Sequence, residues 1–222
     1  MAFRARVRRA LEAPLGGSLA SRFGAATVTA LVGDARGDER DAVALAEMMD
    51  ALVTAGVPRG RMFVLLAHER PDAGGPAARA RELRETLGVP VLLHDGERGA
   101  HFRAGALADG LEVELDDELR EAEAIVVVGC FRGDGQAGVC GGPAALLPGL
   151  ASTATRRTLA GHDLDAASVL AAARATCALA PVDFALVWSE DDPPRVLAGE
   201  GAAVFDRCDA DGWIVPHARR AP

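Results

Sequence analysis

The chain has 222 residues, half of them hydrophobic and a quarter charged, which is ordinary for a soluble globular protein. Its formal net charge of -8 argues against a nucleic-acid-binding surface, and no apolar run is long enough to span a membrane. Because the basic first residues lack the apolar core of a signal peptide, we expect a cytoplasmic protein that contacts neither nucleic acid nor membrane.

Two features of the composition limit the chemistry. All 24 basic residues are arginine, so no lysine can form a Schiff base, anchor a cofactor or serve a phosphate-binding loop. The four cysteines form no CxxC pair and have no histidine at zinc-finger spacing. We therefore interpret them as reduced thiols, mostly in the core.

The predicted elements begin with a basic extension, residues 1–22, that contains a short amphipathic helix. A first strand is expected at 26–33 and a helix at 42–55, with Asp41 as the capping residue. The pattern then predicts strands at 62–66, 89–93 and 125–128, a helix at 77–87, a loop at 96–110, an exposed or edge strand at 111–115 and a helical turn at 118–122.

The rest of the chain continues this alternation of strands and helices. The expected elements are helices from Ser152 to 159 and over 166–178, strands at 184–188 and 195–198, and a helical turn at 201–206. Alternating strands and helices are typical of parallel sheets with crossover helices. The sequence therefore predicts an α/β protein with a doubly wound (Rossmann-like), mostly parallel sheet, in a single domain over residues 1–222.

A glycine-rich stretch, residues 129–149, follows the apolar strand predicted at 125–128. We interpret it as a loop at the carboxyl end of a central strand, where open α/β sheets usually bind ligands. Glycines permit close approach of the backbone to a ligand, although a tight connection without a ligand would also use them.

Several short motifs occur in a fixed order along the chain: 14–19 (PLGGSL), 33–36 (GDAR), 67–71 (AHERP), 94–95 (HD) and 138–149 (GVCGGPAALLPG). Together they resemble the N-terminal domain of the lactate racemase family, the nickel-pincer-nucleotide racemases and epimerases. The resemblance covers nearly the whole chain and implies the scaffold of that domain.

The chain departs from the family at the positions that carry its chemistry. The resemblance implies that the lysine anchoring the pincer cofactor is replaced by Ala144. One acid–base histidine of the family corresponds to Asp134, and the other falls on Glu69, with His68 one place away. We therefore expect no nickel-pincer reaction and no bound cofactor.

Metal binding stays open as a separate class. The family's nickel-ligating histidine corresponds to Ala160 by strict count, or to His162 if two residues are inserted. Other histidines and carboxylates follow predicted strands, but no spacing among them is diagnostic of a metal site. If a metal is bound, His162 is the expected ligand.

The candidate catalytic residues are His68 and His94, because an imidazole titrates near physiological pH, with Asp134 or Glu69 as partner. Cys140 is a candidate nucleophile in the glycine-rich segment, although such a cysteine is more often a small buried residue. The candidates for binding a carboxylate substrate are Asp34, Arg36, Arg70, Arg132, Gly141 and Gly142.

Two functions fit these residues. The first is a divergent racemase-like enzyme that acts on a small carboxylate-bearing metabolite by acid–base chemistry. The second is a non-catalytic ligand-binding or partner subunit, since the family carries a C-terminal domain that another chain or a second copy would supply. A homo-oligomer or a partner subunit is expected in either case.

Overall fold

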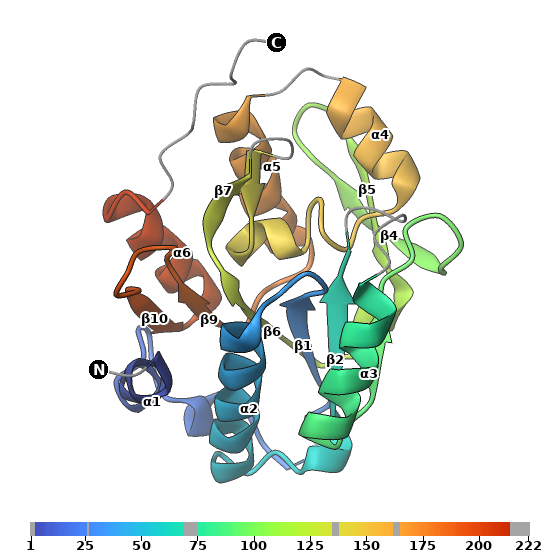
Figure 1. Cartoon of the computed structure of the whole chain (residues 1–222). Helices are drawn as coiled ribbons and strands as arrows, with labels where there is room; N and C mark the ends of the chain where they lie inside the picture. The colour runs from blue at the N-terminus through green and yellow to red at the C-terminus, as the bar shows by residue number, and fades with distance from the viewer. Residues whose placement is uncertain (1–2, 26, 69–74, 135–137, 162–164, 214–222) are drawn as a thin grey trace.

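The computed structural model describes residues 3–25, 27–68, 75–134, 138–161 and 165–213. Its main sheet has six strands in the order β10–β9–β6–β1–β2–β3 (Figure 1). These strands are β1 (Thr29–Asp34), β2 (Met62–Ala67), β3 (Val91–Leu93), β6 (Ala124–Cys130), β9 (Phe184–Trp188) and β10 (Val196–Gly199). Only β10 runs antiparallel to its neighbour, so the expected α/β class with a mostly parallel sheet is confirmed.

Helices cover both faces of this sheet, and α2 and α3 lie in front of it in Figure 1. The helices are α1 (Phe3–Glu12), α2 (Glu39–Thr54), α3 (Pro76–Leu87), α4 (Thr153–Gly161), α5 (Ala166–Leu179) and α6 (Gly201–Ala210). The cap of α2 differs from the expected one. Asp38 is the N-cap, and Asp41 accepts a hydrogen bond from the Asp38 N–H in a capping box.

Each strand contributes side chains to two cores, because successive residues of a strand point to opposite faces. In β1, Leu31 packs in the cluster under α1, α2 and α3, while Ala30 and Val32 pack in the cluster on the other face. All three side chains are completely buried. Since β1 is covered on both faces, it reads in the sequence as a continuous apolar run.

The segment expected to be a loop at 96–110 contains a strand, β4 (His101–Ala106), and this prediction was wrong. It pairs antiparallel with β5 (Glu112–Asp116), which lies in this second sheet and buries Val113 and Leu115. The strand β4 lacks a clear apolar pattern, because its side chains are only partly buried. Its pairing partner, rather than its own sequence, specifies the strand.

The glycine-rich stretch is also more ordered than the expected loop. A short antiparallel hairpin forms from β7 (Arg132–Asp134) and β8 (Gly138–Cys140), and a 3₁₀ turn, η4, follows over Gly142–Ala145. Gly141 joins them with φ of +70°, and a Cβ there would overlap the carbonyl oxygen of Cys130. Glycine is therefore required at this turn for both conformation and space.

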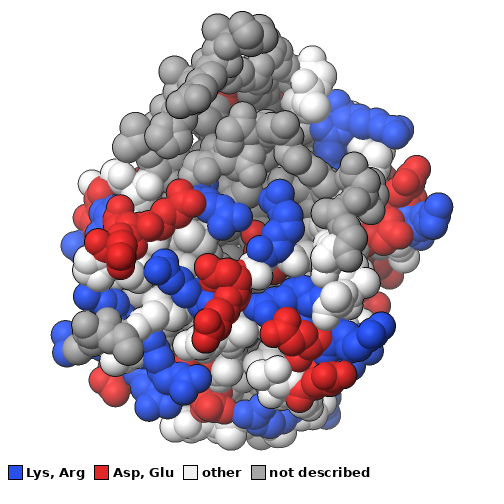
Figure 2. Space-filling view, in the orientation of Figure 1, with Lys and Arg blue, Asp and Glu red and all other residues white. Residues whose placement is uncertain are grey.

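Two further short turns complete the described chain around these elements. They are the 3₁₀ turns η1 (Leu19–Ser21) and η2 (Arg59–Arg61), and the helical turn expected at 118–122 is the 3₁₀ turn η3 (Asp117–Arg120). Within the described ranges, no helix combines the length and the apolar character that crossing a membrane requires. Acidic and basic side chains are interleaved over the face seen in Figure 2, where they can pair locally.

Candidate functional site

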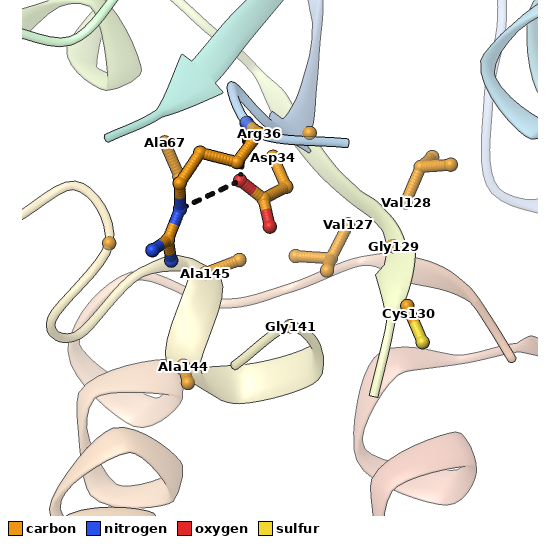
Figure 3. A pocket seen from close by; sticks show the side chains of 12 residues that line it. Asp34, Arg36, Ala67, Val127, Val128, Gly129, Cys130, Gly141, Ala144 and Ala145 are labelled. Carbon is orange, nitrogen blue, oxygen red and sulfur yellow. Dashed lines mark hydrogen bonds and ion pairs between the residues drawn. The ribbon is translucent and has the colours of Figure 1, made fainter. Parts of the chain in front are cut away.

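A pocket lies at the carboxyl ends of the neighbouring strands β1, β2 and β6, and the turn η4 closes its other side (Figure 3). It encloses about 410 Å³, open solvent included. Its lining residues are Gly33, Asp34, Arg36, Ala67, Val127, Val128, Gly129, Cys130, Gly141, Ala144, Ala145 and Gly149. This is the edge of an open α/β sheet at which ligands usually bind.

Asp34 brings two arginines together at this pocket. Its Oδ1 accepts the backbone N–H of Arg36 at 2.8 Å and lies 3.9 Å from Nε of the same residue. Its Oδ2 lies 3.6 Å from Nη2 of Arg132. Figure 3 shows the carboxylate pointing into the space between Val127 and Ala145. One carboxylate thus faces two guanidinium groups, and a guanidinium group can bind an anionic ligand through charge-assisted hydrogen bonds.

A second carboxyl group, Asp41, interacts electrostatically with this group from the start of α2. Burial, together with the negative charges of Asp34 and Asp38, raises the pKa of Asp41 to about 7, while the hydrogen bond from the Asp38 backbone and the charge of Arg132 oppose this rise. A carboxyl that titrates near neutrality beside the pocket is a typical result of desolvation. Sequence reasoning identified Asp41 only as a helix cap.

His68 follows Ala67 directly, at the end of β2, and is 9% exposed. Its backbone N–H donates to the Gly149 carbonyl at 3.2 Å. Its ring Nδ1 is buried and has no hydrogen-bond partner among the described residues. Burial lowers the pKa of the imidazole, and the positive charges of Arg36 and Arg156 lower it further, so the ring is neutral at physiological pH.

His94 is fixed in a different way. Its Nδ1 lies 2.7 Å from Oδ2 of Asp116, its Nε2 lies 3.0 Å from the Ala151 carbonyl oxygen, and its side chain is completely buried. Both ring nitrogens are therefore engaged by groups of the protein. This geometry favours a structural role for His94 over the catalytic role expected from the sequence. His94, His68 and Arg132 do not line the pocket itself, although Ala67, which precedes His68, and Asp34, which pairs with Arg132, do.

The other expected site residues divide into two groups. Gly141 lines the pocket, and Gly142 is buried against the ring of Phe131 at the start of η4. The backbones of Asp134 and Cys140 lie in β7 and β8, where Cys140 pairs with Arg132, but their side chains are outside the described structure. Glu69, Arg70 and His162 also lie outside the described residues.

Sequence reasoning overlooked a cysteine that does reach the pocket, Cys130 at the end of β6. Burial raises the pKa of its thiol to about 12, although the charge of Arg132 opposes this effect. The thiol is therefore protonated at neutral pH and is a weak nucleophile. The sequence could have indicated that Cys130 reaches the pocket, because this residue lies two positions after the end of the predicted strand.

The residues of the pocket do not fit the pincer cofactor that the family resemblance implies. Attachment of that cofactor requires a lysine at position 144, and the methyl group of Ala144, 1% exposed, stands there beside Ala145. The chain contains no other lysine to replace it. In the described part of the chain, no group of three or more His, Cys, Asp or Glu side chains is arranged to hold a metal ion.

Comparison with known proteins shows the family to which the chain is related. The model of the lactate racemase N-terminal domain matches residues 3–167. The lactate racemase apoprotein from Thermoanaerobacterium thermosaccharolyticum superposes with a TM-score of 0.75 at 19% identity, over 95% of this chain and 55% of that one. A protein from Thermotoga maritima superposes with a TM-score of 0.64 at 15% identity, over 95% and 57% of the two chains.

The chain therefore spans about half the length of the solved structures that it matches. At these identities, the two superpositions show a shared fold only. A comparison with curated protein sequences gives no match.

Proposed function

Because the chain belongs to the lactate racemase family by its match to that family's N-terminal domain, we propose that it binds a small carboxylate-bearing metabolite in the pocket. It then transfers a proton at the carbon next to that carboxylate. The observation that carries this proposal is the placement of Arg36 and Arg132 around Asp34 at the pocket. A guanidinium group binds a carboxylate through paired hydrogen bonds.

His68 is the proposed proton acceptor. A general base must be unprotonated at working pH and must have a ring nitrogen free to receive the proton. The lowered pKa of His68 meets the first requirement, and its unpartnered Nδ1 among the described residues meets the second. The C–H bond breaks with its electron pair left on the substrate, next to the carboxylate, and the proton passes to the imidazole, which becomes an imidazolium and can return it.

Return of the proton to the opposite face of the carbon requires a second acid–base group or a water molecule. Asp134 and Glu69 remain the sequence-based candidates for this group. The proposed reaction requires no pincer cofactor, because Ala144 offers no nucleophile to anchor one. Every step assigned to the chain uses its own side chains.

A second candidate function is a non-catalytic subunit that binds the same carboxylate and works with a partner chain or a second copy. The engagement of both ring nitrogens of His94 favours it, because the second expected acid–base histidine is already bonded. This subunit would share the pocket and the arginines with the proposed enzyme. The two functions differ only in whether a proton moves.

Solvent exchange separates them. We would incubate the purified chain with D- and L-lactate and other small 2-hydroxy acids in D₂O and follow the Cα proton by NMR. The proposed enzyme incorporates deuterium faster than a protein-free control, and His68→Gln abolishes this gain. Binding without exchange would identify the subunit, and absence of both binding and exchange would contradict both functions.

A further inference from the structure

Arg156 in α4 forms a hydrogen bond with His68, the residue that follows β2. Its Nη1 donates to the carbonyl oxygen of His68 at 3.0 Å, over a separation of 88 residues. Its Nη2 donates to Thr153 Oγ1 at 3.3 Å, within the first turn of the same helix. Because Gly149 accepts the N–H of His68, both backbone groups of that histidine are held by the 149–156 segment.

Gly96 provides the space that this guanidinium occupies. A Cβ built at Gly96 would overlap Nη2 of Arg156 and would lie 2.9 Å from its Cζ. The N–H of Thr153 also donates to the Gly96 carbonyl at 2.6 Å, which holds the start of α4 against residue 96. The missing side chain at 96 is therefore needed for the path of Arg156 to His68.

On the basis of the proposed function, we infer that Arg156 is a positioning residue, which fixes the backbone of His68 beside the pocket and places a positive charge near its ring. Among the described residues, the charged and titratable groups that act on this ring are Arg36 after β1, Arg156 in α4, His94 after β3, and Asp34 at the end of β1. Only Arg156 combines a hydrogen bond to His68 with an electrostatic effect on its ring, among the described residues.

Substitution of Arg156 tests both effects without requiring a known substrate. Arg156→Gln removes the charge and the reach of the guanidinium, and Arg157→Gln is its control, since Arg157 is exposed on the same helix. Gly96→Ala displaces the guanidinium and keeps its charge on the protein. For each full-length variant we would follow the Cε1 proton of His68 by NMR across pH, together with the binding of lactate and the circular dichroism spectrum.

We expect Arg156→Gln to raise the pKa of His68, because a positive charge that opposes protonation is lost. Gly96→Ala should shift it in the same direction, and Arg157→Gln should leave it at the wild-type value.

A His68 titration that is the same in Arg156→Gln and in the wild type would overturn the inference. If Arg156→Gln does not fold, Gly96→Ala decides the question by the same titration. If the wild type binds no small carboxylate, the proposed function fails, and the titration still decides the role of Arg156 on its own.

Discussion

The Nδ1 atom of His94 lies 2.7 Å from Oδ2 of Asp116, and this buried pair joins the end of β3 to the end of β5. The other ring nitrogen of His94 contacts the carbonyl oxygen of Ala151, two residues beyond the pocket residue Gly149. The second sheet and the segment after η4 are thus attached to the main sheet through one imidazole. Its ring also meets that of His101 edge to face, with centroids 5.6 Å apart.

Removal of this pair should destabilise the protein strongly. We expect Asp116→Asn and His94→Ala each to lower the free energy of unfolding by about 2–4 kcal/mol, because the first replaces the carboxylate beside the buried imidazole with a neutral amide and the second leaves Asp116 and the Ala151 carbonyl without the imidazole. Urea denaturation measures the change. The matched control is Asp117→Asn, whose side chain is 42% exposed and pairs with the exposed Arg120. Equal stabilities for Asp116→Asn and Asp117→Asn would contradict the structural role of His94.

Asp41 should make the stability depend on pH around neutrality. The pKa of this carboxyl is raised from its ordinary value of 3.8 to about 7 by burial. A carboxyl group whose pKa is raised in the folded state stabilises that state at low pH. This stabilising contribution is lost as the pH rises from about 4 through about 7. We expect Asp41→Asn to be more stable than the wild type at pH 8, on the order of 1–2 kcal/mol, and to show a flatter pH dependence.

Thermal denaturation between pH 4 and pH 8 measures this effect. Asp50→Asn is the control, because Asp50 lies on the same helix and its side chain is 62% exposed. A wild type whose stability rises from pH 5 to pH 8 while Asp41→Asn stays constant would show the opposite sign.

The turn at Gly141 should tolerate no side chain. Gly141→Ala strains a residue with φ of +70° and also drives a methyl group into the carbonyl of Cys130, so we expect a loss of about 3 kcal/mol or more. Gly110→Ala separates the two causes, since Gly110 has φ of +85° and nothing within 4 Å of a built Cβ. It should cost only about 1 kcal/mol in unfolding free energy. Similar losses for the two variants would show that space at Gly141 is unimportant.

The main sheet was predictable because its strands are buried on both faces. The run over 184–188 matches β9 residue for residue, and the run ending at 66 lies within β2. The strand β4 was not predictable, because it combines exposed side chains such as Arg103 with partly buried ones and so has no apolar pattern. Its formation depends on pairing with β5, the next strand along the chain, and not on its own side chains alone.

The site residues, too, were predictable only where they lie next to a strand that the sequence itself indicates. Asp34 and Arg36 were found because they directly follow a strand whose end was predicted within a residue or so. Asp116 and Arg156 were missed, because each meets its histidine from another element, 22 and 88 residues away. A weak signal existed for Arg156, which lies one helical turn before buried Leu159 and one after the buried Ser152.

Calorimetric titration of lactate and related small monocarboxylates into the wild type and three variants tests most directly whether this pocket binds a carboxylate. Arg36→Gln and Arg132→Gln each remove one guanidinium near Asp34, and Arg61→Gln removes an exposed one in η2. We expect saturable binding to the wild type and to Arg61→Gln, and about tenfold weaker binding to the other two. Absence of saturable binding to the wild type, or equal affinities in all four proteins, would contradict a carboxylate site at this pocket.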